Sequence, residues 1–585
     1  MDPVTLAVVR GALEQISDEM DLHLIHAALS PIISETNDCA HGIYLPGTGE
    51  TIAQGSYGLP QFLANMQFTV QHVVKVAEAQ GGFHDGDIWI LNDPYCSGTH
   101  LQDIVLISPY FVDGKLALLL ANTGHWMDIG GSTPGGWVPN ATSIHQEGVI
   151  IPPVRLCDAG VINHPLIDTI MANSRLAEQV RGDLAAMMNV FTVGRRGIDA
   201  LYAKHGAAKL GDAIAEMMLR SEAQMRSYIE EIPDGVYQVK DYFDNDGVED
   251  KALTVELTLT VSGSDLHFDF TGTSPLTKGP MNISASTAKS MCFVALKHIF
   301  PDVPVNGGAF RPIRFSIPHA SILSAIYPAP VGGTTDVTQR VVDVVFGALA
   351  QAIPEKVPAA PFGTTGVVTI SGMRPRTNNY FVAVYPYPGG YGGSAVSDGL
   401  VNGTPPGSMA KFMSVEMSEY RYPVRFNYLA IREGSGGAGR HRGGCGTAFG
   451  ITALAECDVS VLGDRVDHVP FGVQGGESAA PNSVSFLIGK KEWVAPLRSK
   501  MTAVHLKPGD SIHLKSPGGG GFGPPRERDP ESVLEDLNSG LIDRATAETV
   551  YGVKVAEYAT PRGNAHFEFI DAAERLPGVT PATAA

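Results

Sequence analysis

Two copies of the pattern His-x-x-Asp lie close together in the chain, as His100 with Asp103 and His125 with Asp128. Two apolar runs of strand length separate them, and the Asp113-Gly114 dipeptide between these runs is typical of a tight turn. This arrangement predicts a β-hairpin whose open end gathers both pairs. Imidazoles and carboxylates that converge in this way can bind a divalent metal ion, so the segment predicts a metal site.

The register of this hairpin decides which side chains meet. Folding the chain about the turn places Asp103 opposite Gly124, one residue from His125, and places His100 opposite Met127. Because successive side chains of a strand point to opposite faces, a slip of one residue would turn alternate side chains away from the site. The predicted site therefore depends on the register.

Two other interpretations stay open at the level of residue chemistry. A single His-x-x-Asp pair is more often a hydrogen-bonded pair in a loop than a pair of metal ligands. Cys96, four residues before His100, could supply a thiolate to zinc, but a structural zinc site needs a second Cys or His pair, which this segment lacks. We favour a mixed nitrogen and oxygen site with open coordination positions, which is the catalytic kind.

The composition limits the class of protein. A chain of 585 residues is too long for a single core and predicts several domains. The formal net charge of −19 argues against a nucleic acid partner and disfavours an anionic membrane surface. The N-terminus does not resemble a signal peptide, and no apolar run approaches the ~20 residues of a membrane span. The six scattered cysteines, with no CxxC pair, indicate reduced thiols, so we expect a cytoplasmic protein.

The periodicity of apolar residues predicts the elements that would position the site. Helical spacing covers residues 3–29, 61–79, most of 165–230, and 337–352, whereas strands are expected around the hairpin and between 236 and 272. The expected fold class is α+β with several domains. The predicted domains are a mixed α/β metal-binding domain (1–232), an α/β domain with a β-rich start (233–400), a β-rich, glycine-rich domain (401–525) and a helical C-terminal tail (526–585).

Two glycine-rich segments invite a nucleotide-binding interpretation, which their surroundings do not support. Residues 434–439 match GxGxxG, but the Arg440-His441-Arg442 run that follows cannot open a helix well. Residues 516–523 lack the Lys-Ser/Thr of a phosphate loop. If the activity uses ATP, we expect another chain to bind it.

The chain resembles the hydantoinase B/oxoprolinase family over nearly its whole length. The resemblance rests on a series of sequence blocks: Ser30–Asp38, the segment from Asn92 to Asp103, Gly124–Gly131, Gln146–Gly148 with Pro152-Pro153, Asn173–Arg175, Arg181–Leu184, Ser435–Gly446 and Gly518–Gly523. Together these blocks are specific to the family, though not to one substrate.

The resemblance implies the metal-bearing B-type subunit of an ATP-dependent enzyme. Its A-type partner binds ATP and Mg²⁺ and phosphorylates the substrate, which is a hydantoin, N-methylhydantoin, 5-oxoproline or another lactam. The family's ligands for a divalent ion (Mn, Zn or Fe) fall on Asp38, His100, Asp103 and His125. Cys39 and His41 differ from the residues that relatives often carry after the Asp, which leaves the substrate assignment open.

The implied chemistry suggests roles for further residues. A divalent ion would lower the pKa of a bound water, and the resulting hydroxide could attack a carbonyl activated by phosphorylation. Asp128 would orient His125 or accept a proton, and Glu147 would act as a base, unless it is a surface carboxylate. Arg175 and Arg181 would bind phosphate or, in the simpler interpretation, form surface salt bridges.

Two alternatives to the hydrolase remain. The chain could be the corresponding subunit of an ATP-dependent ketone carboxylase of the acetone or acetophenone type. It could also be a scaffold subunit without catalytic residues. Metal analysis separates the scaffold from the two enzymes.

Overall fold

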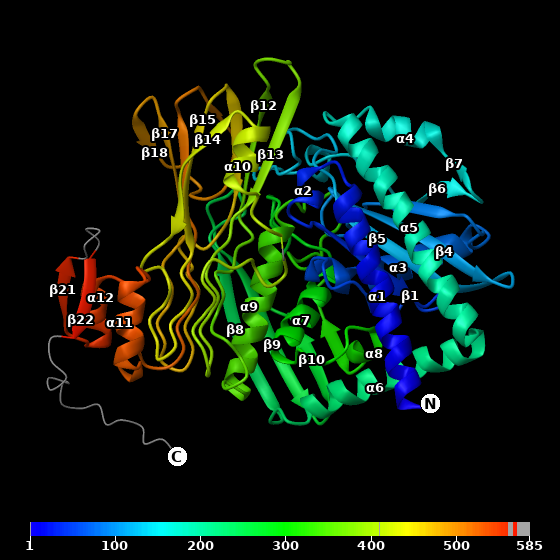
Figure 1. Cartoon of the computed structure of the whole chain (residues 1–585), viewed down its shortest axis with the longest axis horizontal. Helices are drawn as coiled ribbons and strands as arrows, with labels where there is room; N and C mark the ends of the chain where they lie inside the picture. The colour runs from blue at the N-terminus through cyan, green and yellow to red at the C-terminus, as the bar shows by residue number, and fades with distance from the viewer. Residues whose placement is uncertain (1, 97, 409, 560–564, 570–585) are drawn as a thin grey trace.

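The computed structural model describes residues 2–96, 98–408, 410–559 and 565–569. Helices and several β-sheets alternate along this chain, which confirms the predicted α+β class with several domains (Figure 1). The boundaries between the four predicted domains stay a prediction. In the described part of the chain, no helix is both long and apolar enough to cross a membrane.

A seven-stranded antiparallel sheet carries the predicted site. Its strand order is β2-β1-β5-β4-β3-β6-β7, with β1 Cys39–Tyr44, β2 Thr51–Gln54, β3 Ile88–Leu91, β4 Asp103–Val112, β5 Lys115–His125, β6 Val154–Asp158 and β7 Val161–Ile162.

Helices cover both faces of this sheet (Figure 1). The helices α1 (Pro3–Ala27) and α5 (Ala177–His205) pack on the face that carries Leu118 and Leu120, whereas α3 (Pro60–Ala79) packs on the face that carries Leu119. Because side chains alternate along a strand, neighbouring residues of β1, β4 and β5 enter different cores.

The predicted hairpin is present, but its register differs by one residue from our expectation. Asp103 pairs with His125 rather than Gly124, because a β-bulge between Tyr110 and Phe111 adds one residue to the partner strand. The difference brings Asp103 and His125 directly opposite each other on the α3 face of the sheet.

The second sheet lies next along the chain and packs against two helices. Its order is β11-β10-β9-β8, with β8 Gly235–Phe243, β9 Leu253–Ser262, β10 Asp265–Asp269 and β11 Ile313–Ser316. The helix α9 (Thr334–Ala352) lies against β8 and β9 and contacts α7 (Ala285–Ile299). It begins three residues before the predicted Val337, and its N-terminus reaches a cavity lined by the predicted ligands His100 and His125.

Two further sheets enclose a separate core. One has the order β13-β12-β16-β19 and the other the order β14-β15-β20-β17-β18. Their strands are β12 Val367–Met373, β13 Tyr380–Pro386, β14 Val424–Ile431, β15 Thr447–Ala453, β16 Cys457–Leu462, β17 Ser483–Ile488, β18 Lys491–Trp493, β19 Met501–Leu506 and β20 Ser511–Lys515.

A glycine block lies beside these sheets, formed by residues 389–393, 399–403, 434–446, 472–476 and 517–523. Its extended segments hydrogen-bond to one another through the backbone, for example from Gly437 N–H to Gly519 O at 2.8 Å. A Cβ atom added to Gly443 would lie 1.8 Å from Gly519 O, so no side chain fits between the segments. Both glycine-rich sequence segments therefore pack against backbone.

The last segment is helical only in part. The helix α11 (Pro530–Asn538) is followed by the short α12 (Arg544–Thr546) and then by a hairpin of β21 (Val555–Ala559) and β22 (Ala565–Phe569). The sequence analysis did not predict this hairpin. The remainder of the predicted tail lies outside the described residues.

The remaining α-helices of the described chain are α2 (Pro31–Ser34), α4 (His164–Met171), α6 (Ala207–Ile229), α8 (Gly307–Phe310) and α10 (Val415–Arg421).

Candidate metal centre

Three of the predicted ligands meet at the end of the hairpin. His100, in the turn before β4, and the paired residues Asp103 and His125 each offer a ligand atom, and these atoms lie within 4.8 Å of one another. Each residue is at most 3% exposed. The bulged register thus produces a compact group of one carboxylate and two imidazoles.

Asp38, the ligand that only the family resemblance implied, borders the same site. It directly precedes β1, and its carbonyl oxygen accepts a hydrogen bond from the backbone N–H of His125 at 3.1 Å. Asp38, His100 and His125 line a cavity of about 20 Å³. This volume accommodates a water molecule or a small ion.

Buried polar atoms without partners are concentrated in these four residues. Asp38 Oδ1, Asp103 Oδ1 and both ring nitrogens of His100 and His125 are buried and make no hydrogen bond within the described chain. His100 Nδ1 lies 2.5 Å from Asp103 Oδ2, yet the two groups are not aligned for a hydrogen bond. Because buried polar groups nearly always have partners, these atoms fit the nitrogen and oxygen ligands of a divalent ion.

The electrostatics of the site favour a cation. Burial, followed by the charge of Asp103, raises the pKa of Asp38 well above its usual value. Burial would also raise the pKa of Asp103, but the adjacent His100 outweighs it and lowers that pKa. Burial and the neighbouring His100 lower the pKa of His125 to about 3, so its imidazole is neutral and able to bind a metal.

Trp137 packs against both imidazoles and was not foreseen from the sequence. Its ring stacks on His125 with centroids 4.9 Å apart and lies 5.7 Å from the ring of His100. Thr335, at the start of α9, and Thr365, just before β12, also line the cavity. These residues come from loops and segments far from the hairpin, where no local pattern marks them.

Comparison with known proteins assigns the fold to a family. The model of the Hydantoinase B/oxoprolinase family matches residues 2–525. The chain belongs to this family. The caprolactamase subunit beta of Pseudomonas jessenii is 30% identical, over 95% of this chain and 96% of the relative.

Two solved structures share the fold. The ATP-dependent caprolactamase from Pseudomonas jessenii superposes with a TM-score of 0.88 at 28% identity, covering 95% of this chain and 97% of that chain. A nucleotide-free acetone carboxylase gives a TM-score of 0.87 at 18% identity, covering 97% and 81%. The second likeness concerns the fold alone.

In this member of the hydantoinase B/oxoprolinase family, Asp128 does not orient His125. Its buried carboxylate accepts hydrogen bonds from the backbone N–H groups of Gly130, Gly135 and Arg175, and from Arg175 Nη1 at 3.0 Å. The predicted role in orienting His125 is therefore wrong, since neither ring nitrogen of His125 has a hydrogen-bond partner in the described chain. Asp128 instead holds the loop that follows the hairpin, and Arg175 donates two of the hydrogen bonds that hold it. The alternative role of Asp128 as a proton acceptor stays a prediction.

Glu147 is a buried residue and not a surface carboxylate, being 1% exposed. Its two oxygens accept hydrogen bonds from the backbone N–H groups of Val331 and Gly332, at 3.0 and 2.8 Å. Burial nevertheless raises its pKa to about 8. The carboxylate holds the loop that leads into α9, and its proposed action as a base stays a prediction.

Two other predicted candidates lie outside the metal group. Cys96 donates to Asp93 Oδ2 at 3.3 Å, and burial together with Asp93 raises the pKa of its thiol to about 12, so it offers no thiolate to the group. Arg181 forms an exposed salt bridge with Asp168 at 2.9 Å, as the simpler interpretation held.

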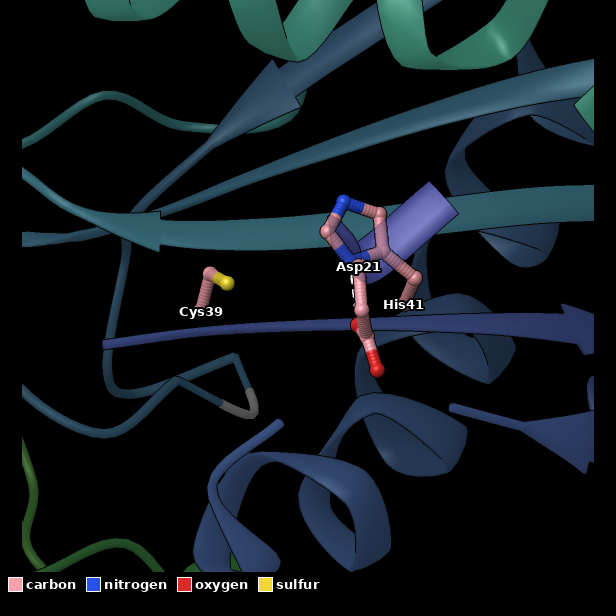
Figure 2. Close-up of side chains that lie close together, drawn as sticks. All are labelled: Asp21, Cys39 and His41. Atoms are coloured by element: carbon pink, nitrogen blue, oxygen red, sulfur yellow. Dashed lines mark hydrogen bonds and ion pairs between the residues drawn. The ribbon is translucent and has the colours of Figure 1, made fainter. Parts of the chain in front are cut away.

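The two positions that depart from the family pattern form a second buried group. Cys39 and His41 on β1 have ligand atoms within 4.8 Å of one on Asp21 of α1 (Figure 2). This group lies on the sheet face opposite Asp103 and His125. His41 Nδ1 and Asp21 Oδ1 are hydrogen-bonded at 2.5 Å. Asp21 Oδ2 accepts from the backbone N–H of Tyr57 at 3.1 Å.

Proposed function

We propose that this chain is the metal-bearing subunit of an ATP-dependent hydrolase that opens a cyclic amide. The observation that carries the proposal is the set of six buried atoms on Asp38, His100, Asp103 and His125 that have no hydrogen-bond partner in the described chain. Three of these residues line one cavity, and Asp103 lies next to its two imidazoles. Family membership and the likeness to a caprolactamase subunit support the substrate class of hydantoins, N-methylhydantoin, 5-oxoproline and other lactams.

The four residues would hold a divalent ion, namely Mn, Zn or Fe. Such an ion lowers the pKa of a water ligand and so provides a nucleophile near neutral pH. The two carboxylates would balance its charge, while the neutral imidazoles would complete the ligand set. Trp137 covers both imidazoles and keeps bulk water from them.

A second chain would supply the activated substrate. The sequence contains no complete phosphate-binding motif, and the relative of known activity is named as one subunit of its enzyme. We therefore infer an A-type partner that binds ATP and Mg²⁺ and phosphorylates the amide oxygen.

The size of the cavity adds a requirement. A volume of about 20 Å³ does not hold a lactam ring. Ser408 and Ala410 form one wall. The adjoining Gly407 accepts a hydrogen bond from the backbone N–H of Gln61 and donates its own N–H to Gln339 Oε1. Substrate binding therefore requires one wall to move.

Co-expression with the neighbouring A-type chain tests the proposal. We expect ATP turnover and ring opening with at least one member of a panel of hydantoins and lactams, and loss of both in His125→Ala. If no cyclic amide stimulates ATP turnover, the proposal is wrong.

A ketone carboxylase is the second candidate, because the fold matches acetone carboxylase with a TM-score of 0.87. Incorporation of labelled bicarbonate into acetone or acetophenone, without ring opening of any cyclic amide, would favour it. Full activity of a metal-free complex would instead favour a scaffold subunit.

A further inference from the structure

The N-terminus of α9 lies at the metal cavity. Thr335 is the second residue of this 19-residue helix, and it lines the cavity together with Asp38, His100 and His125. Gly333 at the N-cap supplies no side chain to the first N–H groups of the helix. The N–H groups of Thr334, Asp336 and Val337 donate to backbone carbonyls, whereas the N–H of Thr335 makes no hydrogen bond within the described chain. This free N–H and the helix dipole favour a negative charge at the end of the helix.

Two unpaired hydroxyls provide an independent observation at this place. Thr335 and Thr365 are each 6% exposed, and the hydroxyl oxygen of each is buried without a hydrogen-bond partner in the described chain. Both residues line the cavity. Buried hydroxyls without partners are uncommon, and here they are available to donate to a ligand.

The other residues of the cavity lack a cation. Apart from the metal ligands and the two threonines, the lining consists of Ile32, Leu59, Gln61, Trp137, Val367, Val384, Pro386, Ser408 and Ala410. Neither Lys nor Arg contributes to this lining in the described residues. Hydroxyls and a helix end are therefore the groups near the metal ligands that can stabilise additional negative charge.

We propose that Thr335, Thr365 and the N-terminus of α9 form a subsite for a tetrahedral oxyanion beside the metal ligands. The subsite binds the phosphoryl group of the activated amide once the cavity has opened for the substrate, and this assignment rests on the proposed function. The threonines act as positioning residues, because their hydroxyls donate to phosphoryl oxygens and fix the activated carbon relative to the metal ligands.

Neighbouring hydrogen bonds fix the position of this subsite relative to the metal ligands. Glu147 fixes the loop before α9 through the N–H groups of Val331 and Gly332. The Thr334 hydroxyl donates to Val331 O at 2.6 Å and also lies 3.4 Å from the carbonyl oxygen of Thr99, the residue before His100. The helix end and the ligand turn thus lie next to each other.

The test uses the full chain loaded with Mn²⁺ and inorganic phosphate as the probe. Paramagnetic broadening of the phosphorus resonance reports phosphate close to Mn²⁺, and titration calorimetry gives the affinity. We expect Thr335→Val and Thr365→Val to weaken phosphate binding by about tenfold or more, because each loses a hydrogen bond to a charged group. Thr335→Ser keeps the hydroxyl and should retain binding.

Thr369→Val is the matched control. Thr369 on β12 is 2% exposed and also has an unpaired hydroxyl, but it does not line the cavity. It should leave phosphate affinity unchanged, and all variants should keep the bound metal. In the reconstituted complex, Thr335→Val should lower kcat for ring opening more than it changes KM.

The outcomes separate this inference from the proposed function. Phosphate binding that is absent in the wild type, or unchanged in both cavity variants, overturns the subsite. An equal loss of affinity in Thr369→Val overturns it as well. A complex that binds phosphate as expected but opens no cyclic amide keeps the subsite and overturns the function.

Discussion

Two buried groups of histidine and aspartate occupy opposite faces of the same sheet, and they differ in how their polar atoms are satisfied. In both, a histidine Nδ1 lies 2.5 Å from a carboxylate oxygen. On the α1 face, His41 and Asp21 are hydrogen-bonded, and the second oxygen of Asp21 accepts from Tyr57 (Figure 2). On the α3 face, both nitrogens of His100 and of His125 lack partners.

This difference shows that proximity alone does not identify a metal site. Asp21, Cys39 and His41 contain nitrogen, oxygen and sulfur ligands as close together as those of the predicted centre. Their carboxylate is already satisfied, however, and of their nitrogen and oxygen atoms His41 Nε2 is the one without a partner in the described chain. The first group contains a hydrogen-bonded pair that joins α1 to β1, whereas the second has the unpaired atoms that a cation would satisfy.

The largest expected effect separates the two groups by metal content. His125→Ala should remove the bound divalent ion and lower the activity of the complex by about 100-fold or more, since a ligand matters at least as much as its supporting residues. Elemental analysis and an ATP-dependent ring-opening assay measure both. His41→Gln should keep the metal. If His41→Gln lost the metal and His125→Ala retained it, the metal site would have to be assigned to the group on the α1 face.

The second prediction concerns stability. Asp21→Ala should lower the free energy of unfolding by about 3–5 kcal/mol, because it leaves His41 buried without its acceptor. Denaturant unfolding followed by fluorescence gives the change, and the metal content should stay constant. An unchanged stability would show that the pair does not anchor α1.

The third prediction concerns the pH dependence of stability, which reports on the buried Glu147. Its pKa is raised to about 8 by burial, above the value of an unfolded glutamate, so the folded protein loses stability as pH rises from about 4.5 to 8. Between pH 5 and pH 7 the wild type should lose about 3 kcal/mol relative to Glu147→Gln. If the difference in free energy of unfolding between the two proteins stayed constant with pH, the raised pKa of Glu147 would be contradicted.

The smallest effect is expected at an exposed pair. Arg181 and Asp168 have side chains that are 51% and 68% exposed. Arg181→Ala should therefore change the free energy of unfolding by at most about 0.5 kcal/mol and leave the activity unchanged. A marked loss of activity would instead restore the interpretation of Arg181 as a phosphate ligand.

The sequence predicted the elements of the site better than their fine geometry. The Asp113-Gly114 turn and its apolar flanks predicted the hairpin, but nothing marks the bulge at Tyr110 that sets the observed register. Asp38 was predicted to be a metal ligand only from the family resemblance.

The residues that the sequence analysis missed come from distant segments. Trp137, Thr335 and Thr365 reach the cavity through tertiary contacts, which no local periodicity encodes. Asp128 and Glu147 were predicted to be catalytic, and their hydrogen bonds show that each holds a loop, while their action on a proton stays a prediction. The spacing of residues suggests which side chains could be ligands, whereas supporting roles depend on the packed structure.

The glycine block has a consequence for how this chain can vary. At Gly390, Gly392 and Gly443 even one added methyl group would lie 1.8 Å from a neighbouring carbonyl oxygen. Substitutions at these positions are therefore not tolerated during neutral evolution. In a random library, most variants that change one of these glycines would fail to fold. Directed evolution toward new substrates should spare the block and concentrate its diversity on the cavity walls.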